Sequence, residues 1–173
     1  MKDLKLYAEA IPVFERAIEG RKQTEGDQSL NYAMCKAMAA GAYRDSGDYV
    51  TADLYLKDAY LKVALEYGED SVSASVILNS QGMLYKMQSK FERARDNYEK
   101  SLQIREKFFG ADHPETMATR HNLGELYISW AKPDKAQEYF EQNVELMQKK
   151  SEKEKLEQSA ARSHSDNPLI WLK

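Results

Sequence analysis

The side chains that most often carry chemistry are scarce in this sequence. Its only histidines are His113, His121 and His164, and its only cysteine is Cys35. No two of them have the His-x-x-x-His or Cys-x-x-Cys spacing of a metal site, and nothing near Cys35 resembles the partner of an activated thiolate. There is no glycine-rich phosphate loop, and the many carboxylates are spread along helix-like segments. The sequence therefore predicts a protein that is not an enzyme and uses no metal or cofactor.

Composition narrows the class of partner. The chain has 173 residues, a formal net charge of −3 and 31% charged residues, which is typical of one soluble domain. No cluster of Lys and Arg stands out, so we expect no nucleic-acid surface. No stretch approaches the ~18 apolar residues of a membrane span. We expect a protein or peptide partner, and no small-molecule substrate.

The compartment stays open. One cysteine excludes an internal disulfide and favours a reducing compartment. No targeting segment is visible. The cytoplasm fits these observations, and so does an organelle such as the mitochondrion if a presequence has been removed.

One motif recurs along the chain. Leu123-Gly124-x-x-Tyr127 is followed by Ala136-x-x-x-Phe140, and shifting the sequence by 42 residues reproduces the pattern without gaps. The small residue falls at Ala40, Gly82 and Gly124, the tyrosine at Tyr43, Tyr85 and Tyr127, and the last pair at Ala10/Phe14, Ala52/Leu56, Ala94/Tyr98 and Ala136/Phe140.

These motifs resemble the tetratricopeptide repeat, over residues 4–150. The period of 42, the linker FGADHP at 109–114 and the pair His121-Asn122 are similar to the longer kinesin-light-chain-like variant. The resemblance implies an all-α, right-handed solenoid of antiparallel helix pairs. Small residues would let the first helix of each pair approach the second, and neighbouring pairs would stack to bury their apolar faces.

The repeat divides the chain into five segments. Residues 1–25 are a lone second helix of an incomplete repeat, and residues 26–67, 68–109 and 110–150 are three full repeats. Residues 151–173 are a charged capping helix and a flexible tail with an apolar tip. Within them we expect helices at 29–45, 48–67, 71–88, 90–108, from 114 onward, and from 133 to at least 150, with Ser29 and Ser71 as N-caps.

The N-terminal segment poses two questions. Pro12 disfavours a helix interior, so the helix either starts near residues 9–11 or bends there. The missing first helix has three explanations: a removed presequence, a truncated gene model or a longer native chain. The lone helix either caps the solenoid or offers Leu4, Leu6 and Ile11 to another protein.

The repeat stops after residue 150, because the next shift places Asp166 on Gly124. Residues 151–161 either prolong the preceding helix or form a separate cap. Beyond them, Leu169, Ile170 and Trp171 form the apolar tip, which packs either on the last repeat or on another subunit.

In tetratricopeptide solenoids the first helices line the concave face, so the resemblance implies a binding surface there. The clamp for a C-terminal carboxylate found in chaperone-binding members is absent, because Ala37 and Gly41 stand where Lys and Asn are needed. Four methionines fall on the face and either accept a peptide or pack between helices. The candidate residues are Met34, Met38, Arg44, Asn79, Met83, Lys86, Met87, His121, Asn122 and Glu125.

The sequence favours a non-enzymatic protein-interaction scaffold, acting as a subunit or assembly factor of a larger complex. A transient peptide-binding cargo or signalling adaptor similar to kinesin light chain is the alternative. From another class, a regulatory component of an enzyme is the third. The identity of the partner, the oligomeric state and the choice between groove and ends as the binding surface stay open.

Overall fold

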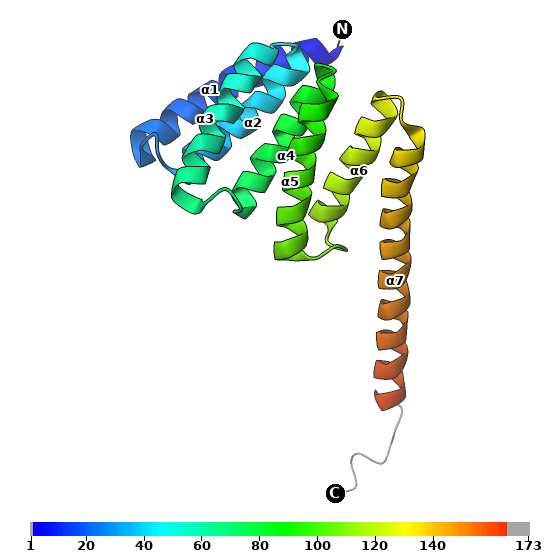
Figure 1. Cartoon of the computed structure of the whole chain (residues 1–173). Helices are drawn as coiled ribbons and strands as arrows, with labels where there is room; N and C mark the ends of the chain where they lie inside the picture. The colour runs from blue at the N-terminus through cyan, green and yellow to red at the C-terminus, as the bar shows by residue number, and fades with distance from the viewer. Residues whose placement is uncertain (1, 166–173) are drawn as a thin grey trace, which may run out of the picture.

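The fold is a single row of helices that pack as consecutive antiparallel pairs (Figure 1). A computed structural model of the chain describes residues 2–165, with the side chains of residue 7 and residues 9–161. The helices are α1 (Lys2–Glu25), α2 (Leu30–Ser46), α3 (Tyr49–Tyr67), α4 (Val72–Met87), α5 (Phe91–Phe109), α6 (Pro114–Ser129) and α7 (Pro133–Ser165). We call α2, α4 and α6 the first helices, and α1, α3, α5 and α7 the second helices.

Local sequence explains where the first helices begin. The side chains of Ser29 and Ser71 accept hydrogen bonds from the backbone N–H groups of Tyr32 and Ala74, so each serine caps its helix as expected. At α6, Pro114 occupies the first turn, where its missing N–H costs nothing. The predicted helices therefore exist, with ends that differ from the expected ones by one or two residues.

Glycine decides where the second helices end. Gly68 and Gly110 terminate α3 and α5 with φ of +88° and +91°, a conformation that other residues adopt at a cost. The equivalent position in the last repeat is Glu152, and no Gly or Pro occurs between Asp134 and Asn167. As a result, α7 continues without interruption to Ser165.

The expectation of a separate charged capping helix after residue 150 is therefore wrong for the part of the chain described. Residues 151–165 prolong α7, which was the other alternative, and this extension projects beyond the helix row (Figure 1). The ion pair between Lys153 and Glu157, spaced four residues apart, lies within this extension of the helix.

The N-terminal helix also differs from one expectation. It runs from Lys2 to Glu25 with Pro12 inside it, so it does not begin at residues 9–11. It packs on α2, where Phe14 and Ile18 contact Tyr32 and Ala39. This packing on the next repeat outweighs the local cost of a proline in the helix.

Two tyrosines fix α1 to the first repeat through one carboxylate. The hydroxyls of Tyr43 and Tyr55 donate to Oε1 of Glu15 at 2.9 and 2.8 Å. The equivalent tyrosine of the next repeat, Tyr85, donates to Asp53 of α3 at 3.0 Å. In these two repeats the motif tyrosine thus binds its first helix to the second helix of the preceding repeat.

Within each pair, a small residue and a large one occupy the same space. A Cβ atom built on Gly82 would lie 2.6 Å from Cδ1 of Tyr98, closer than any normal contact, and a Cβ on Gly124 would clash with Phe140. The corresponding pair in the first repeat is Ala40 with Leu56. Here the small residue is larger than glycine, and the large residue is smaller than tyrosine or phenylalanine. The structure confirms that small residues permit close approach of the two helices.

Substitution of Gly82 by alanine tests this complementarity. We expect Gly82→Ala to lower the free energy of unfolding by about 1–3 kcal/mol, since the methyl group overpacks against Tyr98. Gly41→Ala is the matched control, because no atom lies within 4 Å of a Cβ at that helical glycine. It should raise stability by up to ~1 kcal/mol through helix propensity. Urea unfolding of both variants measures the difference.

A second substitution makes the test specific. Gly82→Ala combined with Tyr98→Leu recreates the Ala40/Leu56 pair, so it should be more stable than Gly82→Ala alone. If the double variant is the less stable of the two, the steric explanation is wrong.

The tyrosines at Glu15 predict a loss of stability in alkali. Burial, followed by hydrogen bonding to Glu15, raises the pKa of Tyr43 to about 12 and also raises the pKa of Tyr55. Unfolded tyrosine has a pKa of about 10, so this contribution is complete below pH ~10 and is lost as the pH rises towards 12. The urea midpoint should fall between pH 8 and pH 11, and less steeply in the Tyr43→Phe, Tyr55→Phe variant. An equal fall in both proteins would contradict this assignment.

Candidate functional site

The first helices contact one another along the row. Helix α2 packs on α4 and α4 packs on α6, whereas α3, α5 and α7 make no comparable contacts with one another in the described part of the chain. Helices that are closer together lie on the inner side of a curved stack. We therefore take the exposed side of α2, α4 and α6 as the inner face.

Four of the predicted site residues connect these helices to one another. Nη1 of Arg44 lies 3.5 Å from Sδ of Met83, and Nδ2 of Asn79 lies 4.0 Å from the same sulfur. Nδ2 of Asn122 donates to Oδ1 of Asn79 at 3.1 Å. Arg44, Met83, Asn79 and Asn122 thus form a continuous chain from α2 to α6. These contacts help to set the spacing between neighbouring repeats.

The methionines divide into two groups. Met34 and Met83 are half-buried and pack against the apolar core clusters. For these two residues the structure agrees with the alternative in which the methionines pack between helices. Met38 and Met87 are 61% and 47% exposed. Only the second pair presents flexible apolar side chains to solvent, as a peptide-binding surface requires.

The remaining predicted residues give the inner face its charges. Glu125 and His121 are exposed on α6, and Lys86 is half-buried on α4. The guanidinium of Arg44 is paired with the carboxylate of Asp45 at 2.7 Å. The face therefore combines two exposed methionines with separated charges of both signs, an arrangement that can hold an extended or helical peptide.

The two histidines whose side chains are described, His113 and His121, occupy structural positions. Nδ1 of His113 accepts from the N–H of Glu115 at 3.2 Å and so caps α6, and its ring stacks on Phe109 at 4.5 Å. The ring of His121 contacts Phe140 of α7, with 5.2 Å between the ring centres. The side chain of His164 lies outside the described residues.

Other features of the described residues point to no chemistry of their own. Cys35 is half-buried beside the core cluster around Ile18. Residues 2–165 contain no group of three His, Cys, Asp or Glu that could hold a metal ion. In the same part of the chain, no helix has the length and apolar character needed to cross a membrane.

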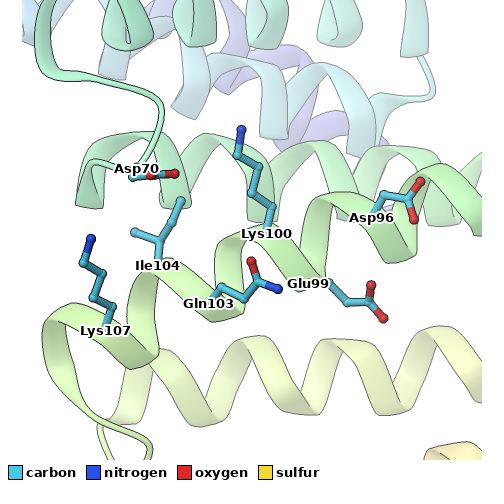
Figure 2. Close-up of a pocket in the computed structure, with 7 residues that line it drawn as sticks. All are labelled: Asp70, Asp96, Glu99, Lys100, Gln103, Ile104 and Lys107. Atoms are coloured by element: carbon cyan, nitrogen blue, oxygen red, sulfur yellow. The ribbon is translucent and has the colours of Figure 1, made fainter.

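The pocket shown in Figure 2 belongs to the repeat itself. It has a volume of about 460 Å³ and lies where Asp70 of the linker faces Ile104 and Lys107 of α5. Lys100, on its rim, is already bonded to the carboxylate of Glu69 at 2.8 Å. The residues one repeat further along, Asp112, Leu146 and Lys149, line a second pocket of the same kind. A niche that recurs beside two successive linkers is a consequence of the architecture.

Sequence analysis missed two buried arginines. Arg105 is 4% exposed and donates to the carbonyl oxygen of Glu115 and to Thr119 at 2.8 and 2.9 Å. Burial lowers the pKa of Arg105, while the Glu115 carboxylate opposes that shift. The arginine therefore ties the end of α5 to the start of α6.

The second arginine joins three helices. Arg120 of α6 is 2% exposed and donates to Glu106 of α5 at 2.6 Å and to Asn143 of α7 at 2.9 Å. One repeat earlier, Val63 and Leu78 occupy the positions of Arg105 and Arg120. Two repeats earlier the same positions hold Arg21 and Lys36, so the repeat pattern alone does not mark either arginine as buried.

The predicted end contacts are only partly described. Ile11 is half-buried on α1. The side chains of Leu4 and Leu6 lie outside the described residues, as do Leu169, Ile170 and Trp171. The contacts predicted for these five residues therefore stay predictions.

Comparison with known proteins agrees with this geometry. A family model described as tetratricopeptide repeat matches residues 62–149, just over half of the chain. No curated protein matches at a significant level.

Two structures are among the solved structures that are similar to the chain. BtubC (BKLC) from P. vanneervenii has a TM-score of 0.72 and 25% identity, over 83% of this chain and 56% of that one. A kinesin-light-chain-like protein from Podosopora anserina, with nearly identical TPR-like repeats, has a TM-score of 0.71 and 20% identity, over 83% and 68%. The second likeness shows the fold alone, and this chain spans 56% of the length of BtubC.

Truncation of single methionines separates the two groups. Met83→Ala should destabilise the protein by about 1–2 kcal/mol, because a half-buried side chain loses its contacts. Met87→Ala should change stability by less than ~0.5 kcal/mol, because its side chain is largely exposed. Thermal unfolding of the two variants measures this difference, and equal effects would contradict the division.

Proposed function

The chain belongs to the tetratricopeptide repeat family, and from this premise we propose that it is a non-enzymatic scaffold that binds a protein partner on its inner face. Domains of this family are generally protein–protein interaction modules. In a solenoid, each repeat contacts only its neighbours, so a long surface stays open to a partner.

One observation carries the proposal: Met38 and Met87 stay exposed on helices whose other methionines are packed. Exposed large apolar side chains next to charged groups are typical of peptide-binding surfaces. Met38 and Met87 lie in neighbouring repeats, and Met87 is seven residues beyond the position equivalent to Met38. A single peptide that crosses α2 and α4 can therefore contact both. Lys86 lies on the same helix as Met87 and favours a partner that carries an acidic group beside its apolar anchors.

The absence of catalysis is part of the proposal. Among the described histidines, His113 is occupied in capping α6 and His121 rests against an aromatic ring. Arg105 and Arg120 are saturated by carbonyl, hydroxyl, amide and carboxylate groups of the chain itself. These groups are positioned for packing, which supports a binding role.

Within binding proteins we favour a fixed subunit or assembly factor of a larger complex. Helix α1 and the extension of α7 beyond the helix row add surfaces outside the three full repeats that a partner subunit can contact. The second candidate is a transient peptide adaptor, and the structural likeness to a kinesin-light-chain-like protein favours it. The two candidates differ in the stoichiometry and salt sensitivity of the complex.

Native purification of the tagged full chain tests the proposal. We expect a protein partner at near one-to-one stoichiometry by mass spectrometry. Met38→Glu combined with Met87→Glu should remove it, since each apolar anchor contributes about 1–4 kcal/mol to such an interface. A salt-sensitive partner at low stoichiometry would instead favour the transient adaptor.

A matched control protects this test from a general effect of added charge. Leu54→Glu combined with Leu65→Glu changes two residues of α3 that are 61% and 78% exposed, and it should retain the partner. If the inner-face variant also retains every partner, the inner face is not the binding surface.

A further inference from the structure

The last helix pair leaves an apolar groove open to solvent. The groove has a volume of about 410 Å³ and lies between the end of α6 and the first turns of α7. Ile128 and Val144 on its walls are 53% and 51% exposed. We call it the end groove, lined by Ile128, Pro133, Gln137, Phe140, Glu141 and Val144, with Glu145 at its rim.

The repeat shows what normally covers this surface. One repeat earlier, the positions of Pro133, Phe140 and Val144 are Phe91, Tyr98 and Leu102. These three side chains pack in one cluster with Leu123 and Leu126 of α6.

Two repeats earlier the same arrangement is found. The equivalent residues Tyr49, Leu56 and Tyr60 pack in one cluster with Ile77 and Leu84 of α4. In both cases the next first helix covers the site. The end groove is thus the seat of a first helix that α7 does not supply.

Residues 166–173 do not reach the end groove while α7 stays helical. At 1.5 Å per residue, the stretch from Val144 to Ser165 carries the chain roughly 32 Å away. Residues 166–173 span at most ~29 Å when fully extended. Figure 1 shows α7 pointing away from the helix row over this length.

Charge argues against a second copy of the chain in the same place. The groove carries the carboxylates of Glu141 and Glu145. Two such grooves packed face to face would bring these like charges together, which is unfavourable. A partner with basic residues beside its apolar stripe complements the groove.

We propose that the end groove binds an amphipathic α-helix of another protein, with Lys or Arg along its flank, in the way that α6 lies on α5. The site adjoins the inner face, with which it shares the exposed Ile128 of α6, and it rests on the proposed function only in that the chain is a scaffold. It gives the scaffold a second binding surface of defined chemistry.

The test uses peptides made from the chain's own covering helix. One labelled peptide has the sequence of residues 113–130, and a basic version carries Glu115→Lys and Glu125→Lys. Fluorescence anisotropy measures their binding to the full-length protein. We expect saturable binding, at least threefold tighter for the basic peptide, and at least tenfold weaker binding of both to the Val144→Glu variant.

Two further variants control for folding and for charge. Leu65→Glu places the same charge on an exposed leucine of α3 and should bind like the wild type. Glu141→Lys combined with Glu145→Lys leaves the apolar wall intact and should remove the preference for the basic peptide. Circular dichroism confirms that each variant is folded.

Several outcomes would overturn the proposal. Absence of saturable binding, or equal binding by the wild type and Val144→Glu, would exclude the end groove as a helix site. Tighter binding of a peptide of residues 166–173 would assign the groove to the chain's own tail. A dimer that Val144→Glu dissociates would assign it to a second copy. None of these results affects the inner-face partner, which is measured separately by co-purification.

Discussion

The fold depends on how closely the two helices of each repeat can approach. At Gly82 and Gly124 the first helix has no side chain, and the ring of Tyr98 or Phe140 occupies that space. The contact is a matter of volume, since the buried hydroxyl of Tyr98 has no hydrogen-bond partner among the described residues. Close-packed interiors tolerate little change in volume, so this fit fixes the geometry of each pair.

The fixed geometry of each pair determines which helices contact one another. Two motif tyrosines link their first helix to the preceding second helix, since Tyr43 donates to Glu15 and Tyr85 donates to Asp53. The first helices are thereby brought into mutual contact along one side, and only a few of their side chains stay exposed. The surfaces proposed for binding are those that the repeat cannot cover by itself: the inner face and the end groove.

The sequence predicted the helix pairs and the small-to-large contacts because both recur at one period. It could not resolve which methionines are free, since Met83 and Met87 both fall on the first helix and only packing tells them apart. It also missed the acceptors of the motif tyrosines, because Glu15 and Asp53 are not one period apart. The length of α7 could be predicted in part from the sequence, because Glu152 stands where α3 and α5 have the glycine that ends them.

The central claim is that a partner contacts the exposed methionines of the inner face. Methyl NMR of protein labelled at methionine tests it directly, because the side chains of Met38 and Met87 lie in solvent, whereas those of Met34 and Met83 are half-buried. On addition of the co-purified partner, the account predicts that the methyl signals of Met38 and Met87 shift or broaden first. Unchanged signals from both, with the partner demonstrably bound, would contradict it.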